Sequence, residues 1–119
     1  ARGRGRIIST ASQLALKGAA GIVPYCTAKA ALVGFTRALA REGAPRGILV
    51  NAIAPGPVMT DLTAQLGAEW AERTGAALPA GRVGRPEEIA ASALLLASSP
   101  GGDFFVGATI SPNGGDLMH

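Results

Sequence analysis

The sequence predicts an α/β fold in which parallel strands alternate with helices. The apolar run at residues 48–54 is nearly continuous rather than alternating, which is typical of a parallel strand covered on both faces, and residues 7–10 predict a second short buried strand. Segments with helical periodicity separate the strands, and this alternation favours right-handed parallel crossovers. The 119 residues, 48% hydrophobic and 16% charged, suffice for one layered domain and exclude a disordered chain.

The first half of the chain predicts a strand, a loop, a helix and a second strand. Residues 7–10 are expected to form a short buried strand, followed by a loop at 12–24 that is rich in Gly and Ala. A helix with a broad apolar face is expected to begin at Pro24, because Pro is favoured in the first helical turn, and to end near Gly43. Residues 48–54 form the second expected strand, and a Pro-Gly-Pro tripeptide ends it.

The second half predicts two helical segments and a last strand. Residues 61–78 carry a weaker helical pattern, which Gly75 and Pro79 interrupt. Another helix is expected over 85–97, with Pro at its start and two acidic residues in its first turn, where the helix dipole favours them. Residues 104–110 predict the last strand. Nothing in this order indicates an internal domain boundary.

Composition narrows the classes of function. The net charge is +3, and the Arg-Gly stretch at residues 2–6 is too short and too poor in aromatic residues to favour nucleic-acid binding over a solvated turn. No apolar run approaches the ~18–20 residues of a membrane span, and no signal peptide is recognisable. Cys26 and His119 are the single Cys and the single His, which predicts no metal site. We therefore expect a cytoplasmic protein with neither a nucleic-acid nor a membrane partner.

Three polar residues could act together on a substrate oxygen. Tyr25 and Lys29 stand four residues apart in a predicted helix, so they project from the same face. A neighbouring cation favours the phenolate form of a tyrosine, which suits it to general acid or base catalysis. Ser12 follows the carboxyl end of the first strand, the edge where ligands bind in open α/β sheets. A Tyr/Lys pair at this spacing is also common in ordinary amphipathic packing, so spacing alone leaves both interpretations open.

These residues resemble the signature of the short-chain dehydrogenase/reductase family, Ser followed by Tyr-x-x-x-Lys, with twelve residues between Ser12 and Tyr25. The resemblance covers nearly the whole chain. It includes the family's fifth strand, active-site helix, sixth strand with its Pro-Gly motif, start of the last large helix, and final strand, at residues 5–12, 25–42, 50–60, 84–90 and 107–115. Within the family, the chain is similar to the 3-oxoacyl-(acyl-carrier-protein) reductase type.

The resemblance implies a partial Rossmann-like parallel sheet, made of the last three strands with flanking helices. It also implies an oxidoreductase that acts on a small carbonyl or alcohol with NAD or NADP. Tyr25 would exchange a proton with the substrate oxygen, Lys29 would hydrogen-bond the nicotinamide ribose, and Ser12 would orient the substrate carbonyl. Besides Tyr25 and Lys29, the implied cofactor-binding residues are Pro55, Gly56, Val58 and Thr60.

The same resemblance makes residues 61–78 a mobile lid over the substrate. Leu62, Leu66 and Trp70 are its candidate pocket residues, and ordinary amphipathic packing explains these three equally well. Family members are usually homo-oligomers, so the resemblance implies one here.

Residues 1–119 depart from the family pattern in what they lack. The Gly-rich turn that cradles the pyrophosphate has no counterpart in them, so the chain resembles the carboxyl-terminal half of a reductase domain and is expected to be inactive alone. Asn113 stands where the family usually has Asp. The alternative is a non-catalytic half-domain that acts by self-association or by pairing with a partner through an exposed strand edge.

Overall fold

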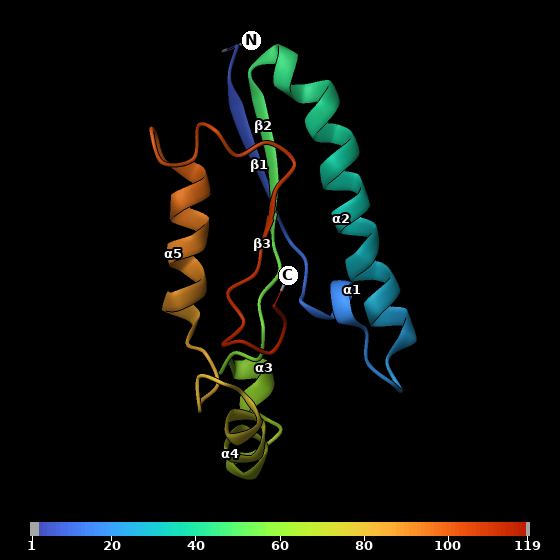
Figure 1. The fold of residues 1–119 in the computed structure, drawn as a ribbon, viewed down its shortest axis with the longest axis vertical. Helices are drawn as coiled ribbons and strands as arrows, with labels where there is room; N and C mark the ends of the chain where they lie inside the picture. Colours follow the sequence, from blue (N-terminus) through green and yellow to red (C-terminus); the bar gives the residue numbers. More distant parts are fainter. Residues whose placement is uncertain (1–2, 119) are drawn as a thin grey trace.

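The structure is a computed structural model that describes residues 3–118, so that Arg2 of the Arg-Gly stretch and His119 lie outside the described residues. Its elements, shown in Figure 1, are β1 (Gly5–Thr10), α1 (Leu14–Lys17), α2 (Val23–Gly43), the 3₁₀ turn η1 (Ala44–Arg46), β2 (Ile48–Ile53), α3 (Asp61–Ala64), α4 (Ala68–Ala77), α5 (Pro86–Ala97) and β3 (Thr109–Ile110).

The described strands form one parallel sheet in the order β1-β2-β3. Gly5 lies opposite Ile48 at one end of the β1–β2 pair and Thr10 opposite Ile53 at the other. Helices α2 and α5 both contact β1 and β2 and lie on opposite sides of the sheet (Figure 1). The predicted α/β class, with three parallel strands and flanking helices, is confirmed.

The core surrounds β2, because this strand is covered on both faces and paired on both edges. Val50 and Ala52 are fully buried in it, and Leu96 of α5 and Val33 of α2 are buried in the helical layers. Asn51 is buried as well, and its side chain accepts a hydrogen bond from the N–H of Ala108 at 2.9 Å and donates one to the carbonyl of Phe105 at 2.8 Å. Asn51 thereby fastens the segment before β3 to the middle of the sheet.

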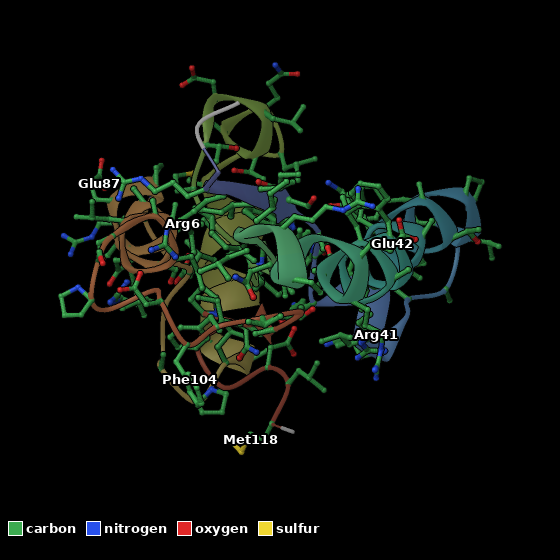
Figure 2. The ribbon with its side chains drawn as sticks, turned by 90° about the horizontal axis from the view of Figure 1, so that it is seen from above. Arg6, Arg41, Glu42, Glu87, Phe104 and Met118 are labelled. Carbon is green, nitrogen blue, oxygen red and sulfur yellow. The ribbon has the colours of Figure 1, made fainter. Side chains whose placement is uncertain are left out.

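Two expectations about strands were wrong in part. The first strand is present but not buried, and Ile7 is 39% exposed, because β1 is an edge strand of this sheet. The last strand covers only Thr109–Ile110 rather than 104–110. Phe104 is fully exposed in a turn at the outside of the molecule (Figure 2), and Gly107, at φ +70°, breaks the extended backbone just before the strand. The segment before the strand is held by the Asn51 side chain and by two backbone hydrogen bonds with β2, from the N–H of Gly107 to the carbonyl of Val50 and from the N–H of Ala52 to the carbonyl of Ala108.

The helices also differ in detail from the prediction. The expected loop at 12–24 contains the short helix α1, and α2 begins one residue before Pro24. The 61–78 segment breaks at Gly67, where φ is +86°, and not at Gly75. Gly75 lies inside α4, where a Cβ would stand 2.9 Å from the Cα of Arg82, so close backbone packing accounts for this glycine.

The start of α5 is confirmed and carries an exposed charge cluster. The Glu88 carboxylate accepts hydrogen bonds from the Arg82 guanidinium at 2.8 and 2.6 Å and from the Arg85 backbone N–H at 2.8 Å. These bonds, the Arg82 side chain first and the Arg85 backbone second, lower the pKa of Glu88 from 4.5 to about 2.

The lowered pKa of Glu88 determines the direction in which the stability changes with pH. Because the folded-state pKa of Glu88 is depressed, its contribution is complete above pH 4.5 and is lost as the pH falls toward about 2. We expect Tm to fall less between pH 5 and pH 2 in Glu88→Gln than in the wild type, as measured by thermal melts across this range. Glu87→Gln is the matched control, since Glu87 shares the first turn but forms no ion pair among the described residues. An unchanged pH dependence in Glu88→Gln would contradict this role.

Candidate active site

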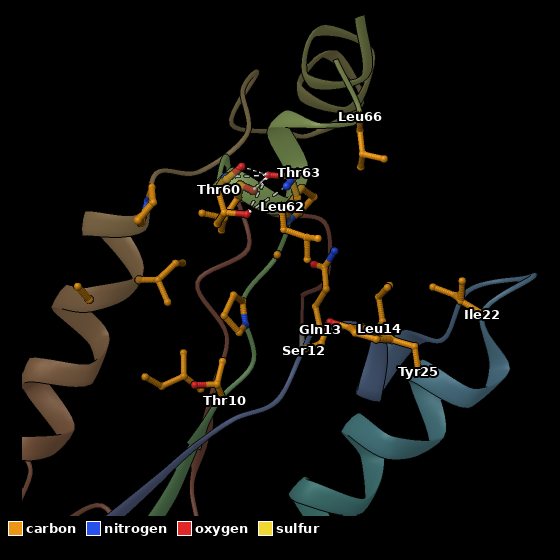
Figure 3. A pocket seen from close by; sticks show the side chains of 18 of the residues that line it. Thr10, Ser12, Gln13, Leu14, Ile22, Tyr25, Thr60, Leu62, Thr63 and Leu66 are labelled. Atoms are coloured by element: carbon orange, nitrogen blue, oxygen red, sulfur yellow. Dashed lines mark hydrogen bonds between the residues drawn. The ribbon is translucent and has the colours of Figure 1, made fainter. Parts of the chain in front are cut away.

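The carboxyl ends of β1 and β2 open onto a cavity of about 870 Å³ (Figure 3). Its walls come from the ends of these strands, the start of α2, the segment after β2, and helices α3, α4 and α5. The cavity brings together every predicted site residue except Lys29, namely Ser12, Tyr25, Pro55, Gly56, Val58, Thr60, Leu62, Leu66 and Trp70.

Ser12 is buried in the turn between β1 and α1. Its Oγ accepts a hydrogen bond from the backbone N–H of Leu14 at 3.1 Å. Because a hydroxyl can donate one hydrogen bond while it accepts another, the Ser12 O–H remains available to a ligand in the cavity. The turn into α1 therefore fixes the position of the Ser12 oxygen and leaves the hydroxyl proton available to donate a hydrogen bond to a ligand.

Tyr25 lies in the first turn of α2 and is half exposed. Figure 3 shows its side chain reaching from α2 toward Ser12 and Gln13. Ser12, in the turn after β1, and Tyr25, in α2, therefore contribute hydroxyl-bearing side chains to the same cavity.

Lys29 lies one turn further along α2, and its ammonium nitrogen is 5.8 Å from the centre of the Tyr25 ring. The ammonium donates a hydrogen bond to the carbonyl of Thr10, the last residue of β1, at 2.8 Å. Since an ammonium carries three donors, this bond leaves two for other partners. Lys29 does not line the cavity itself, but it is anchored to Thr10, which does.

The segment after β2 is held by the chain on both sides. The carbonyl of Pro55 accepts the N–H of Gln13 at 3.0 Å, and the N–H of Gly56 donates to the carbonyl of Pro112 at 3.0 Å. A Cβ on Gly56 would stand 2.6 Å from the Cα of Asn113. In this structure, the close approach of the Asn113 segment is the reason for a glycine at this position.

Val58 and Thr60 take part in the N-cap of α3. The Thr60 Oγ1 accepts the N–H of Thr63 at 3.2 Å, and the Thr63 hydroxyl donates to the carbonyl of Val58 at 2.7 Å. The N–H of Thr60 donates to the Thr63 hydroxyl at 2.7 Å, which completes a capping box.

The three lid candidates all line the cavity, on the side of α3 and α4. Leu62 and Leu66 are 74% and 58% exposed, whereas Trp70 is partly buried. Ordinary packing within this chain does not account for the two leucines, because most of their surface contacts nothing else in it. Their exposure favours contact with a substrate or with another chain.

Sequence analysis missed Gln13 and the residues of α5 that line the cavity, Pro86, Ile89, Ala90 and Ala93. Gln13 is 4% exposed, and its Nε2 donates to the carboxylate of Asp116, which also accepts a bond from the Lys17 ammonium at 2.7 Å. The only signal for Gln13 in the sequence was its place next to Ser12.

Within residues 3–118, no group of three or more His, Cys, Asp or Glu side chains is arranged to hold a metal ion.

The described part of the chain contains no helix with the length and apolar character needed to cross a membrane.

Comparison with known proteins gives extensive matches. A sequence model of the family described as Enoyl-(Acyl carrier protein) reductase matches residues 1–116. The chain is 45% identical over 115 residues to the 3-oxoacyl-[acyl-carrier-protein] reductase FabG of Vibrio cholerae, covering 97% of this chain and 47% of the relative. It is 46% identical over 118 residues to the acetoacetyl-CoA reductase of Rhizobium meliloti, covering 98% of this chain and 48% of the relative.

Comparison with solved structures also finds a protein of similar fold and sequence. The crystal structure of a short-chain dehydrogenase/reductase, titled glucose/ribitol dehydrogenase, from Brucella melitensis matches with a TM-score of 0.88 and 38% identity. That match covers 96% of this chain and 46% of the other. The chain spans about half the length of the curated relatives it matches. This chain therefore belongs to the short-chain dehydrogenase/reductase family, and it is similar to the 3-oxoacyl-(acyl-carrier-protein) reductases within it.

Proposed function

We propose that this chain supplies the proton-transfer site of a nicotinamide-dependent carbonyl reductase or alcohol dehydrogenase. The observation that carries the proposal is the meeting of the Ser12 and Tyr25 hydroxyl groups on one cavity at the carboxyl ends of parallel strands. Lys29, next to Tyr25 and anchored to Thr10, completes the set.

The proposed roles follow from the donors that each side chain has available. The Ser12 hydroxyl, positioned by the Leu14 N–H, donates to the carbonyl oxygen and stabilises the negative charge that develops on it. The Tyr25 hydroxyl gives its proton to that oxygen in reduction and takes a proton from the alcohol in oxidation. Lys29 places its ammonium 5.8 Å from the centre of the Tyr25 ring, on the same face of α2 as the group that exchanges the proton.

The described residues fit the nicotinamide end of a dinucleotide. When bound, NAD or NADP accepts or supplies the hydride. The two uncommitted donors of the Lys29 ammonium suit ribose hydroxyls, and Pro55, Gly56, Val58 and Thr60 line the cavity beside Ser12. No Gly-x-Gly-x-x-Gly turn opens a helix within residues 3–118, so a pyrophosphate cradle of the usual kind has to come from elsewhere.

For this reason we propose that residues 1–119 act as the carboxyl-terminal half of a Rossmann-fold domain, with residues 61–78 as its substrate lid. Such a half would act within a cytoplasmic homo-oligomer. The names of the relatives and the apolar lid residues Leu62, Leu66 and Trp70 make a 3-oxoacyl thioester the first substrate to test.

The test is a chimera in which the part of the Vibrio cholerae relative that this chain does not cover is joined to residues 1–119. We expect the chimera to reduce acetoacetyl thioesters with a nicotinamide cofactor, followed by loss of cofactor absorbance. We expect the chain alone to be inactive, because it brings no phosphate cradle. A folded chimera without any reductase activity would overturn the proposal.

One observation favours the alternative of a non-catalytic half-domain, namely the open edge of β1. The N–H groups of Gly5 and Ala11 donate to the carbonyls of Gly47 and Ile53, on the side of β2. Since donors alternate in direction along a strand, the N–H of Ile8 faces the open edge. An exposed edge of this kind invites pairing with another chain.

We therefore expect the isolated chain to self-associate through β1, and Ile8→Pro to shift it toward the monomer. Proline removes a donor from the open edge while the β1–β2 pairing keeps its own donors. Sedimentation velocity measures the change, with circular dichroism as the check that the fold is retained. A wild-type chain that is monomeric at all concentrations would contradict association through this edge.

A further inference from the structure

Gln13 lines the cavity and carries a buried acceptor with no partner. Its side-chain nitrogen donates to the Asp116 carboxylate, but its Oε1 has no hydrogen-bond partner among the described residues. The residue is only 4% exposed. A buried acceptor without a donor costs free energy, and a ligand that supplies the donor recovers it.

The direction in which the Gln13 amide faces is fixed by chemistry. A carboxylate can only accept, so the amide must present its NH₂ group to Asp116 and its oxygen away from it. The Lys17 ammonium holds the other oxygen of Asp116 at 2.7 Å, so Asp116 is itself anchored. The Gln13 oxygen is therefore a hydrogen-bond acceptor whose orientation is fixed before any ligand binds.

The place of this acceptor connects it with the proposed chemistry. Gln13 follows Ser12 directly, and Figure 3 shows its side chain on the cavity wall close to Ser12, with Tyr25 pointing toward both. The oxygen is shielded from water in this structure, so a ligand reaches it only after a local shift of the residues around it. The other buried polar atoms without partners, on Arg6, Thr36 and Thr109, belong to residues outside the cavity wall.

We propose that Gln13 is a specificity-determining residue, which selects carbonyl compounds that carry an N–H or O–H donor near the reacting carbonyl. The inference rests on the proposed function, because it places the reacting carbonyl at Ser12 and Tyr25. Compounds without the donor, acetoacetyl thioesters among them at the ketone, leave the Gln13 oxygen unpaired and are expected to bind more weakly than donor-bearing carbonyl compounds.

Binding to the 119-residue chain tests this without any turnover. The probes are matched pairs, N-methylacetoacetamide against N,N-dimethylacetoacetamide for an N–H donor, and hydroxyacetone against methoxyacetone for an O–H donor. NMR titration should give a dissociation constant about five- to tenfold lower for the donor-bearing member of at least one pair, as expected from one net hydrogen bond. The pair that shows the preference identifies the donor type.

Gln13→Met should abolish the preference, so that the two members of each pair bind with equal affinity. Gln65→Met is the matched control, since Gln65 does not line the cavity, and it should keep the preference. Asp116→Asn is the second variant, because an amide at 116 can donate as well as accept and no longer fixes the direction of Gln13.

Equal affinities within both pairs in the wild type, or a preference that survives in Gln13→Met, would overturn the proposal. The two proposals fail separately. A chimera that reduces carbonyl compounds while the chain shows no donor preference removes only the role of Gln13. A donor preference that depends on Gln13, in a chain whose folded chimera has no reductase activity, removes only the proposed reaction.

Discussion

Tyr25→Phe is expected to lower the kcat of the chimeric reductase by about 10²–10⁴-fold, the contribution typical of a positioned general acid or base. The variant removes one hydroxyl from the cavity and leaves the ring in place beside Lys29. The hydride step then lacks a proton donor for the substrate oxygen, whereas the apolar contacts that bind the substrate persist. We therefore expect the loss mainly in kcat, with a much smaller change in KM.

The measurement is steady-state reduction of an acetoacetyl thioester, with circular dichroism and thermal melts on the same samples. The fold should be unaffected, because Tyr25 is half exposed and its hydroxyl has no hydrogen-bond partner among the described residues. Cys26→Ser is the matched control on the neighbouring position of α2, where the side chain does not line the cavity, and it should keep turnover near the wild-type value. Tyr25→Phe with full activity would remove Tyr25 from the reaction.

The relative positions of the candidate site residues could be predicted from the sequence where local spacing governs them. Tyr25 and Lys29 share a helix, so their relation depends only on helical geometry. Ser12 was placed by the rule that ligands bind where parallel strands end, and the cavity lies there. The bond from Lys29 to Thr10 could not be predicted, because it depends on how far α2 slides along β1, which long-range packing decides.

The predictions that were wrong or missed also depend on packing between segments that are distant in the sequence. The segment at 104–110 has the composition of a strand, but it begins in a turn, and the side chain of Asn51, more than fifty positions earlier, binds the carbonyl of Phe105. The sequence predicts a helix break at Gly75, whereas in the structure this glycine lets α4 pack against the backbone of Arg82. Gln13 carries no periodic signal, and its partner Asp116 lies at the other end of the chain. Each case depends on a contact between distant segments.

A second large effect is expected on stability, from Leu96→Ala in α5. Leu96 is fully buried and among the largest fully buried side chains in the described residues. Removing it from a packed interior typically costs about 2–5 kcal/mol, through lost burial and the cavity left behind. Small domains are stable by only about 5–15 kcal/mol, so this substitution should bring the chain close to unfolding.

Leu94→Ala is the matched control, because Leu94 lies on the same helix and is 70% exposed. The two variants have the same change in helix propensity, so the difference between their free energies of unfolding isolates burial against the sheet. Urea denaturation should show a loss of about 2–5 kcal/mol for Leu96→Ala and a change within about 0.5 kcal/mol for Leu94→Ala. Equal losses of unfolding free energy in the two variants would mean that Leu94 is buried in solution by another chain, which would then contact the outer face of α5. Because Ile89, Ala90 and Ala93 of the same helix line the cavity, α5 would then contact both the cavity and that other chain.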